Sequence, residues 1–187
     1  PDLIDTQVIL QDREDLDSPA FQGTKTNTTF NNTTSALQLT NPATNSTGEY
    51  AFKDVLDLGA VFSLDLKRKI QAVGFNIGTD IETLIPGSPG ILWDQYAVVD
   101  NNFDGAAADE ANCQIQVATS QTASGSFGSF NNFANGTFKG RRFKFKLILE
   151  TTNTAQNINV QQAGFTAEFQ SRTEQNYQTG SGTSSAA

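Results

Sequence analysis

The chain has 187 residues, with 20 acidic and 12 basic side chains and a net charge of −8 at pH 7. This charge argues against binding to a nucleic-acid backbone, because such binding requires a cationic surface. The absence of histidine excludes Ser-His-Asp and Cys-His nucleophilic sites. The single cysteine, Cys113, excludes an internal disulfide and a zinc site with several thiolates.

The first 48 residues show little of the pattern expected of a core. Residues 1–22 contain six acids among scattered apolar side chains, which predicts an acidic N-terminal arm that docks on a neighbouring part. Residues 23–48 are rich in Thr, Asn and Ser, which predicts a loop region that contributes little to the core.

Strand-like patterns begin near residue 49 and predict an ordered domain over residues 49–170. The stretch EYAFKDVLDLGAVFSLDL is expected to supply one or two strands, and residues 70–77 supply another, in which Val73, Phe75 and Ile77 share a face. Residues 78–111 contain prolines, glycines and acids, which predicts a long loop. Residues 113–119 predict a strand that buries the Cys113 thiol, because this residue alternates with apolar neighbours.

The C-terminal third carries the clearest strand pattern, and residues 141–150 predict a half-buried strand. Apolar side chains on one face alternate there with basic ones on the other: Phe143, Phe145, Leu147 and Leu149 against Arg142, Lys144 and Lys146. Residues 158–169 are expected to pair with this strand across a polar turn, with a bulge at 162–164. Residues 171–187 lose the apolar pattern and predict a flexible linker to a following part.

The fold class follows from these elements. Several short strands, long loops and almost no helical periodicity predict an all-β chain, namely one antiparallel β-sandwich or jelly roll. No run of about 18 apolar residues is present, so no membrane insertion is expected.

Five of the twelve basic residues fall in one short run: Lys139, Arg141, Arg142, Lys144 and Lys146. The favoured interpretation is the solvated face of a strand, and the alternative is a site for an anionic ligand. The Gly/Ser/Asn-rich loop before this run holds Phe127, Phe130 and Phe133. Their spacing of three is not strand alternation, so we expect them to anchor the loop on the end of the core.

One loop combines aromatic and acidic residues in the way a ligand site does. Its candidate binding residues are Trp93, Asp94, Tyr96, Asp100, Phe103 and Asp104. Aromatic faces stack on sugar rings, and carboxylates accept hydrogen bonds from hydroxyl groups, so this mixture suits a glycan. The competing and favoured interpretation is that Trp93 and Phe103 anchor a long loop to the sandwich.

The same loop raises the question of a cofactor. Asp100, Asn102, Asp104 and Gly105 have the near-alternate spacing of oxygen-rich Ca²⁺ loops, although the EF-hand position that requires Glu is Ala111. Ca²⁺ is therefore an alternative to the expectation of no cofactor. Paired carboxylates could serve a glycosidase, but the sequence singles out no pair, and we predict no catalytic residues.

Several stretches resemble a domain of bacteriophage tail-tip or host-specificity proteins, the class that includes the central tip protein of lambda-like phages. The matching elements cover about residues 47–172 and follow the same order: an LDLG strand, a VATS strand, a GRRFKFKLIL strand, and then a final strand with a polar linker. The acidic DLIDT and LWD…FDG elements and the QNI-x-V element add to this likeness. The same order is similar to galactose-binding-like jelly rolls.

The resemblance implies a virion protein at the distal end of a phage tail, in a tip or fibre. It would act in host adsorption or as a tail-end adaptor, and would not be an enzyme. Its partners would be other tail proteins, further copies of itself in a trimer, and a host surface glycan. The alternatives are a carbohydrate-binding module of a secreted protein and, less favoured, a glycan-degrading enzyme.

Overall fold

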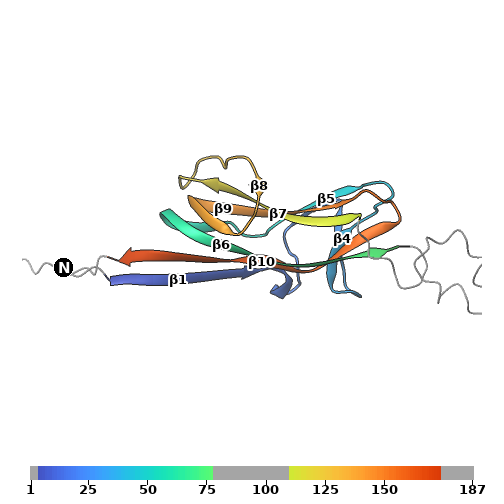
Figure 1. Cartoon of the computed structure of the whole chain (residues 1–187), viewed down its shortest axis with the longest axis horizontal. Helices are drawn as coiled ribbons and strands as arrows, with labels where there is room; N and C mark the ends of the chain where they lie inside the picture. Colours follow the sequence, from blue (N-terminus) through green and yellow to red (C-terminus); the bar gives the residue numbers. More distant parts are fainter. Residues whose placement is uncertain (1–3, 78–109, 174–187) are drawn as a thin grey trace, which may run out of the picture.

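The computed structural model describes residues 4–77 and 110–173 (Figure 1). These residues form antiparallel strands and one short 3-10 helix, η1 (Glu14–Leu16). The strands are β1 (Ile4–Arg13), β2 (Thr24–Thr26), β3 (Thr28–Asn31), β4 (Ala36–Leu39), β5 (Thr47–Ala51), β6 (Leu56–Asn76), β7 (Ala111–Ser120), β8 (Asn131–Asn132), β9 (Gly136–Thr151) and β10 (Gln156–Thr173).

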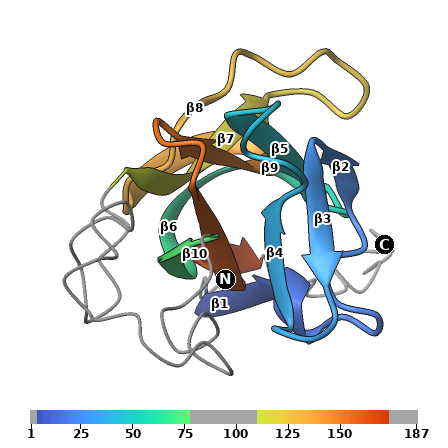
Figure 2. The ribbon, with the colours of Figure 1, turned by 90° about the vertical axis from the view of Figure 1, so that its right-hand side faces the viewer.

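All of these strands belong to one sheet that folds over on itself. The strand order is β2-β5-β9-β6-β10-β4-β3, with β1 added to β10 and with β7 and β8 added to β9. Seen from one end, the sheet forms a nearly closed, barrel-like sandwich (Figure 2). The predicted all-β antiparallel fold of jelly-roll type is confirmed.

Strand β6 joins the two layers of the sandwich. Its first half, from Leu56 to Leu66, runs along β9, and its second half, from Asp65 to Asn76, runs along β10. The register against β9 shifts between Asp57 and Phe62, where Gly59 has a φ of 78° that suits glycine. The two strands predicted on either side of residue 67 are therefore one long strand that passes from one layer to the other.

The predicted pairing of the last two strands is wrong. Strands β9 and β10 each pair with β6, which lies between them in the sheet. They face each other across the core instead, where the rings of Phe145 and Phe165 stack with centroids 4.0 Å apart. The polar turn between them is thus a connection between layers and not a hairpin.

The alternation predicted within these two strands is confirmed. Phe143, Phe145, Leu147 and Leu149 of β9 are all at most 2% exposed. In β10 the register shifts between Val160 and Gln162, so the predicted bulge is present and lies slightly earlier than expected. The bulge keeps apolar residues on both sides of it directed into the same core.

The N-terminal segments are part of the sandwich, in contrast to the predicted arm and loop. Strand β1 pairs with β10 over all of its ten residues. Phe21, Leu37 and Leu39 are at most 1% exposed and belong to the core. The side chain of Asn157 donates to the Leu39 carbonyl (3.0 Å) and accepts from the Leu39 N–H (3.1 Å), which ties β4 to β10.

A buried carboxylate links this N-terminal part to β5. Glu14 is 1% exposed and accepts hydrogen bonds from the Tyr50 hydroxyl and from the Lys53 backbone N–H. The Tyr50 oxygen in turn accepts from the Gly23 N–H at 2.8 Å. Burial raises the pKa of Glu14, and burial together with this carboxylate raises the pKa of Tyr50.

The contribution of residues 23–48 to the core can be measured with Leu37→Ala. We expect this change to lower the free energy of unfolding by about 2–5 kcal/mol, because it leaves a cavity in a closed core. Thr33→Ala, on an exposed position of the same segment, should change it by less than about 0.5 kcal/mol. Equal effects of the two variants in urea denaturation would show that this segment does not stabilise the core.

The Glu14 carboxyl group predicts a particular pH dependence. Because its pKa in the folded state lies above the ordinary value of 4.5, the folded state binds the proton more tightly than the unfolded state does. Stability from this group is therefore present below that ordinary value and is lost as the pH rises through the folded-state pKa. Glu14→Gln lacks this titration. The free energy of unfolding of the wild type, relative to this variant, should fall as the pH rises from below 4.5 to neutral. Parallel curves from urea titrations would contradict the assignment.

Candidate functional site

The six residues predicted to bind a ligand, Trp93, Asp94, Tyr96, Asp100, Phe103 and Asp104, lie outside the described residues. The proposed Ca²⁺ loop at residues 100–105 lies there too. Both remain predictions. Within residues 4–77 and 110–173, no group of three or more Asp, Glu, Cys or His side chains is placed to hold a metal ion. In the same ranges no helix is long and apolar enough to cross a membrane.

The basic run forms the outer face of β9, as the favoured interpretation predicts. Arg142, Lys144 and Lys146 alternate with the buried residues and point away from the core. Strand β7 runs along this part of β9, from Ser120 opposite Arg142 to Gln116 opposite Lys146. Three basic side chains thus follow one another along the same side of the sheet.

Two phenylalanine rings from the loop between β7 and β9 lie against these cations. The Phe127 ring centroid is 4.7 Å from the Arg142 guanidinium carbon and 4.6 Å from the Lys144 Nζ. The Phe130 ring centroid is 4.7 Å from the Lys146 Nζ. Each cation is within the range in which the electron-rich face of an aromatic ring attracts it. We call these five residues the cation–aromatic face.

Backbone contacts hold the loop over β7. The Gly128 N–H donates to the Thr119 carbonyl (2.9 Å), and the Phe133 N–H donates to the Ile115 carbonyl (2.8 Å). Phe133 is 1% exposed, and its ring packs edge-on against that of Phe138 with centroids 5.7 Å apart. The predicted anchoring of this loop in the core is therefore confirmed for Phe133.

The same prediction is wrong for Phe127 and Phe130, which lie on the outer side of the sheet and not at the end of the core. Their spacing in a Gly/Ser/Asn loop gave no indication of which strand they would reach. Their position depends on the pairing of β7 with the basic strand β9. This is a long-range pairing that the sequence does not reveal.

Part of the face is available to solvent. Phe130 is 37% exposed, and Lys144 is also exposed. Lys146 forms an ion pair with Glu49 (Nζ to Oε2, 3.1 Å), whereas no ion pair of Lys144 is found among the described residues. Phe130 lies against Lys146 and Lys144 lies against Phe127, so the exposed ring and the exposed ammonium group belong to the same strip without touching each other. Such a strip can contact the apolar face of a ligand and its anionic group together.

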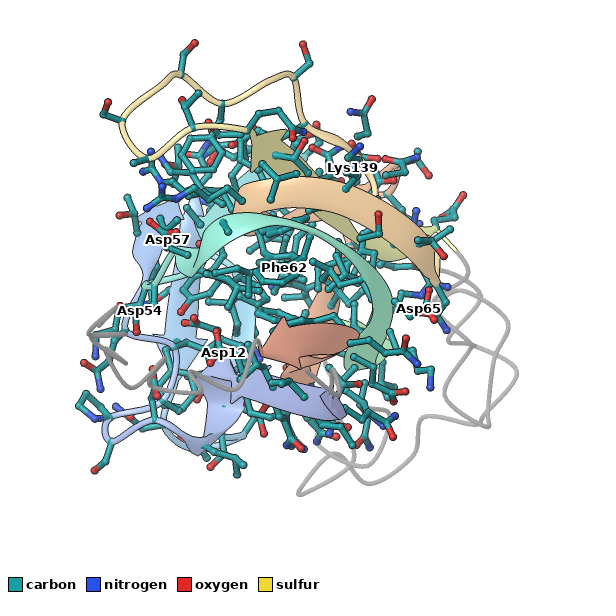
Figure 3. All side chains as sticks on the ribbon, turned by 90° about the vertical axis from the view of Figure 1, so that its left-hand side faces the viewer. Asp12, Asp54, Asp57, Phe62, Asp65 and Lys139 are labelled. Atoms are coloured by element: carbon teal, nitrogen blue, oxygen red, sulfur yellow. The ribbon has the colours of Figure 1, made fainter. Side chains whose placement is uncertain are left out.

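A second group of charged residues lies at one end of the barrel. Figure 3 shows Asp12, Asp54, Asp57 and Asp65 spread around this end, with Phe62 between them. Hydrogen bonds from the Gly59 N–H and from Arg141 lower the pKa of Asp57. Burial, aided by repulsion from Asp17 and Asp54, raises the pKa of Asp12. These carboxylates differ in environment and do not converge on one point.

The thiol of Cys113 lies where the alternation predicts. It is half-buried and packs against the core. Burial raises its pKa to about 12, so the group is a neutral thiol at physiological pH and is a poor nucleophile.

Comparison of the chain with models of protein families, with curated proteins and with solved structures gives no match.

The contacts of Phe127 can be tested through stability. Phe127→Leu keeps an apolar side chain but removes the ring shared by Arg142 and Lys144. We expect the free energy of unfolding to fall by about 1–2 kcal/mol, because the ring makes two cation–π contacts of about 0.5–1 kcal/mol each. In the Lys144→Gln background the loss should be smaller. An equal loss in both backgrounds would show that Lys144 and the ring do not interact energetically.

Proposed function

We propose that this chain is a non-catalytic virion domain of a bacteriophage tail tip or tail fibre, which acts in host adsorption or as a tail-end adaptor. The family resemblance of residues 47–172 supports this role, and the all-β sandwich is compatible with it. In this proposal the protein lies at the distal end of the tail, beside other tail proteins.

The observation that carries the adsorption role is the cation–aromatic face. Bacterial surface polysaccharides commonly combine sugar rings with phosphate or carboxylate groups. The exposed Phe130 ring offers a surface for a sugar ring, and the exposed Lys144 offers a charge for an anionic substituent. The net charge of −8 repels a polyanion at a distance, so contact would depend on this local cationic strip.

The 92–105 loop remains the second place for a glycan contact, through Trp93 and the residues near it. A carbohydrate-binding module of a secreted protein would use the same chemistry. The phage-tail role and the carbohydrate-binding module differ in location, because only the phage-tail role places the chain on virus particles.

Binding is best measured with the full chain and the extracted surface polysaccharide of the host bacterium. Fragments that begin at residue 47 would lack β1 to β4 and the core residues Phe21, Leu37 and Leu39. We expect saturable binding that weakens as salt is added, because the contact includes exposed charges. The double variant Phe130→Ala/Lys144→Gln should bind about tenfold more weakly, which corresponds to about 1.4 kcal/mol.

Lys69→Gln is the matched control, because it removes an exposed positive charge from β6, away from the face. It should bind like the wild type. Loss of binding only in Trp93→Ala would move the contact to the 92–105 loop. No saturable binding by the folded chain would contradict the adsorption role and leave the adaptor role.

Location on the virion has its own test. Antibodies raised against the chain should decorate the distal tail ends of phage particles in electron micrographs, and an excess of the free chain should slow phage adsorption. Recovery of the chain only in the particle-free secreted fraction would support the carbohydrate-binding module. Release of reducing sugar ends from the polysaccharide would support the enzyme.

A further inference from the structure

Strand β1 has one paired edge and one open edge. Its ten residues pair with β10 without a break in register, from Ile4 opposite Thr173 to Arg13 opposite Gly164. Among the described residues, no strand pairs with its other edge. In an antiparallel ladder every second residue directs its N–H and C=O groups to the same side, so β1 presents a regular row of hydrogen-bonding groups there.

The other strands that end the sheet are much shorter. Strands β2, β3 and β8 have three, four and two residues, and short edges are one of the ways in which proteins limit pairing between molecules. The open edge of β1 is therefore the longest of these by far, and it lies along one side of the molecule (Figure 1).

The central six residues of β1 also lack the usual protection of an open edge, and the charged residues of the strand lie nearer its ends. Residues 6–11 read TQVILQ and contain no charge, proline or glycine, although the chain carries 32 charged residues in all, 20 acidic and 12 basic. Charges, prolines and bulges normally guard such edges. Ile9, in the middle of this stretch, is 61% exposed. An open edge whose centre is uncharged and carries an exposed apolar side chain is a template for strand pairing.

We propose that β1 pairs antiparallel with β1 of a second copy of this chain. The two-fold axis would lie midway between the two strands, level with Ile9 of each copy. We choose a second copy as the partner of the open edge because the edge is self-complementary in this register. Ile9 then faces Ile9, Val8 faces Leu10, and Gln7 faces Gln11. Apolar side chains meet apolar ones and amides meet amides, which are favourable cross-strand pairs. The two sheets become continuous, in the order β10-β1-β1-β10.

Backbone geometry restricts the choice of axis. Directly opposite residues of an antiparallel pair turn their backbone groups either both towards each other or both away. In a pair of identical strands, the numbers of two opposite residues must therefore differ by an even number. The two-fold axis then lies level with a residue, and not level with a peptide bond between two residues. An axis at Val8 sets Gln7 against Ile9, and an axis at Leu10 sets Val8 against Asp12. Both bring polar or charged groups against apolar ones, which leaves the Ile9 axis.

This inference is independent of the proposed tail role, and it concerns a two-fold contact, whereas the family resemblance implies a trimer. The test is sedimentation velocity of the full chain over a range of concentrations. We expect a monomer–dimer equilibrium. In Ile9→Lys, like charges would face each other across the axis, and the dimer should weaken by about tenfold or more. Leu16→Lys is the matched control, because Leu16 is 68% exposed but lies outside the strand. It should assemble like the wild type.

Cross-linking tests the register without adding a charge, and so remains decisive if Ile9→Lys does not fold. In a Cys113→Ser background, Ile9→Cys should form an intermolecular disulfide under mild oxidation, because the two cysteines would be directly opposite within disulfide range. Leu16→Cys in the same background should not. A wild type that is monomeric at every concentration, an assembly that is insensitive to Ile9→Lys, or equal cross-linking of the two cysteine variants would overturn the proposal.

Discussion

The stacking of Phe145 on Phe165 is the contact on which the two layers depend, because it joins the strand at the centre of one layer to the strand at the centre of the other. Phe52 and Phe133 extend it, each with its ring centroid less than 6 Å from that of Phe145. Burying an aromatic ring contributes about 1.5–3 kcal/mol, so this cluster holds the layers together. Strand β6 also links the two layers through the backbone, since its two halves belong to different layers.

The closed core leaves function to the outer side of the sheet. Because Phe143, Phe145 and Leu147 are directed inwards, the residues between them must face outwards. The cationic strip on β9 is thus a direct consequence of the same alternation that builds the core. The loop that carries Phe127 and Phe130 then turns this strip into a mixed surface, in which rings and positive charges lie side by side.

The N-terminal segments illustrate how polar composition can conceal a core. Between residues 23 and 48, most Thr, Asn and Ser side chains are exposed, while Leu37 and Leu39 are buried. Two leucines in a stretch of four residues are too few for a periodic signal. The acidic composition of residues 1–22 concealed β1 in the same way, and it also concealed Glu14. This carboxylate is buried only because Tyr50 and the Lys53 N–H, more than 30 residues away, donate hydrogen bonds to it.

The sequence by itself determined the all-β class, the inward face of β9, the bulge in β10 and the core-facing position of Cys113. Each of these depends on alternation within one strand, and alternation is a local property. Only the tertiary structure decided that β6 separates β9 from β10, that β1 completes the sheet, and that Phe127 and Phe130 lie on the basic strand. Strand pairing uses backbone hydrogen bonds that every residue except proline can form. The choice of partner is therefore made by the packing of the whole core, and it leaves little trace in any single segment.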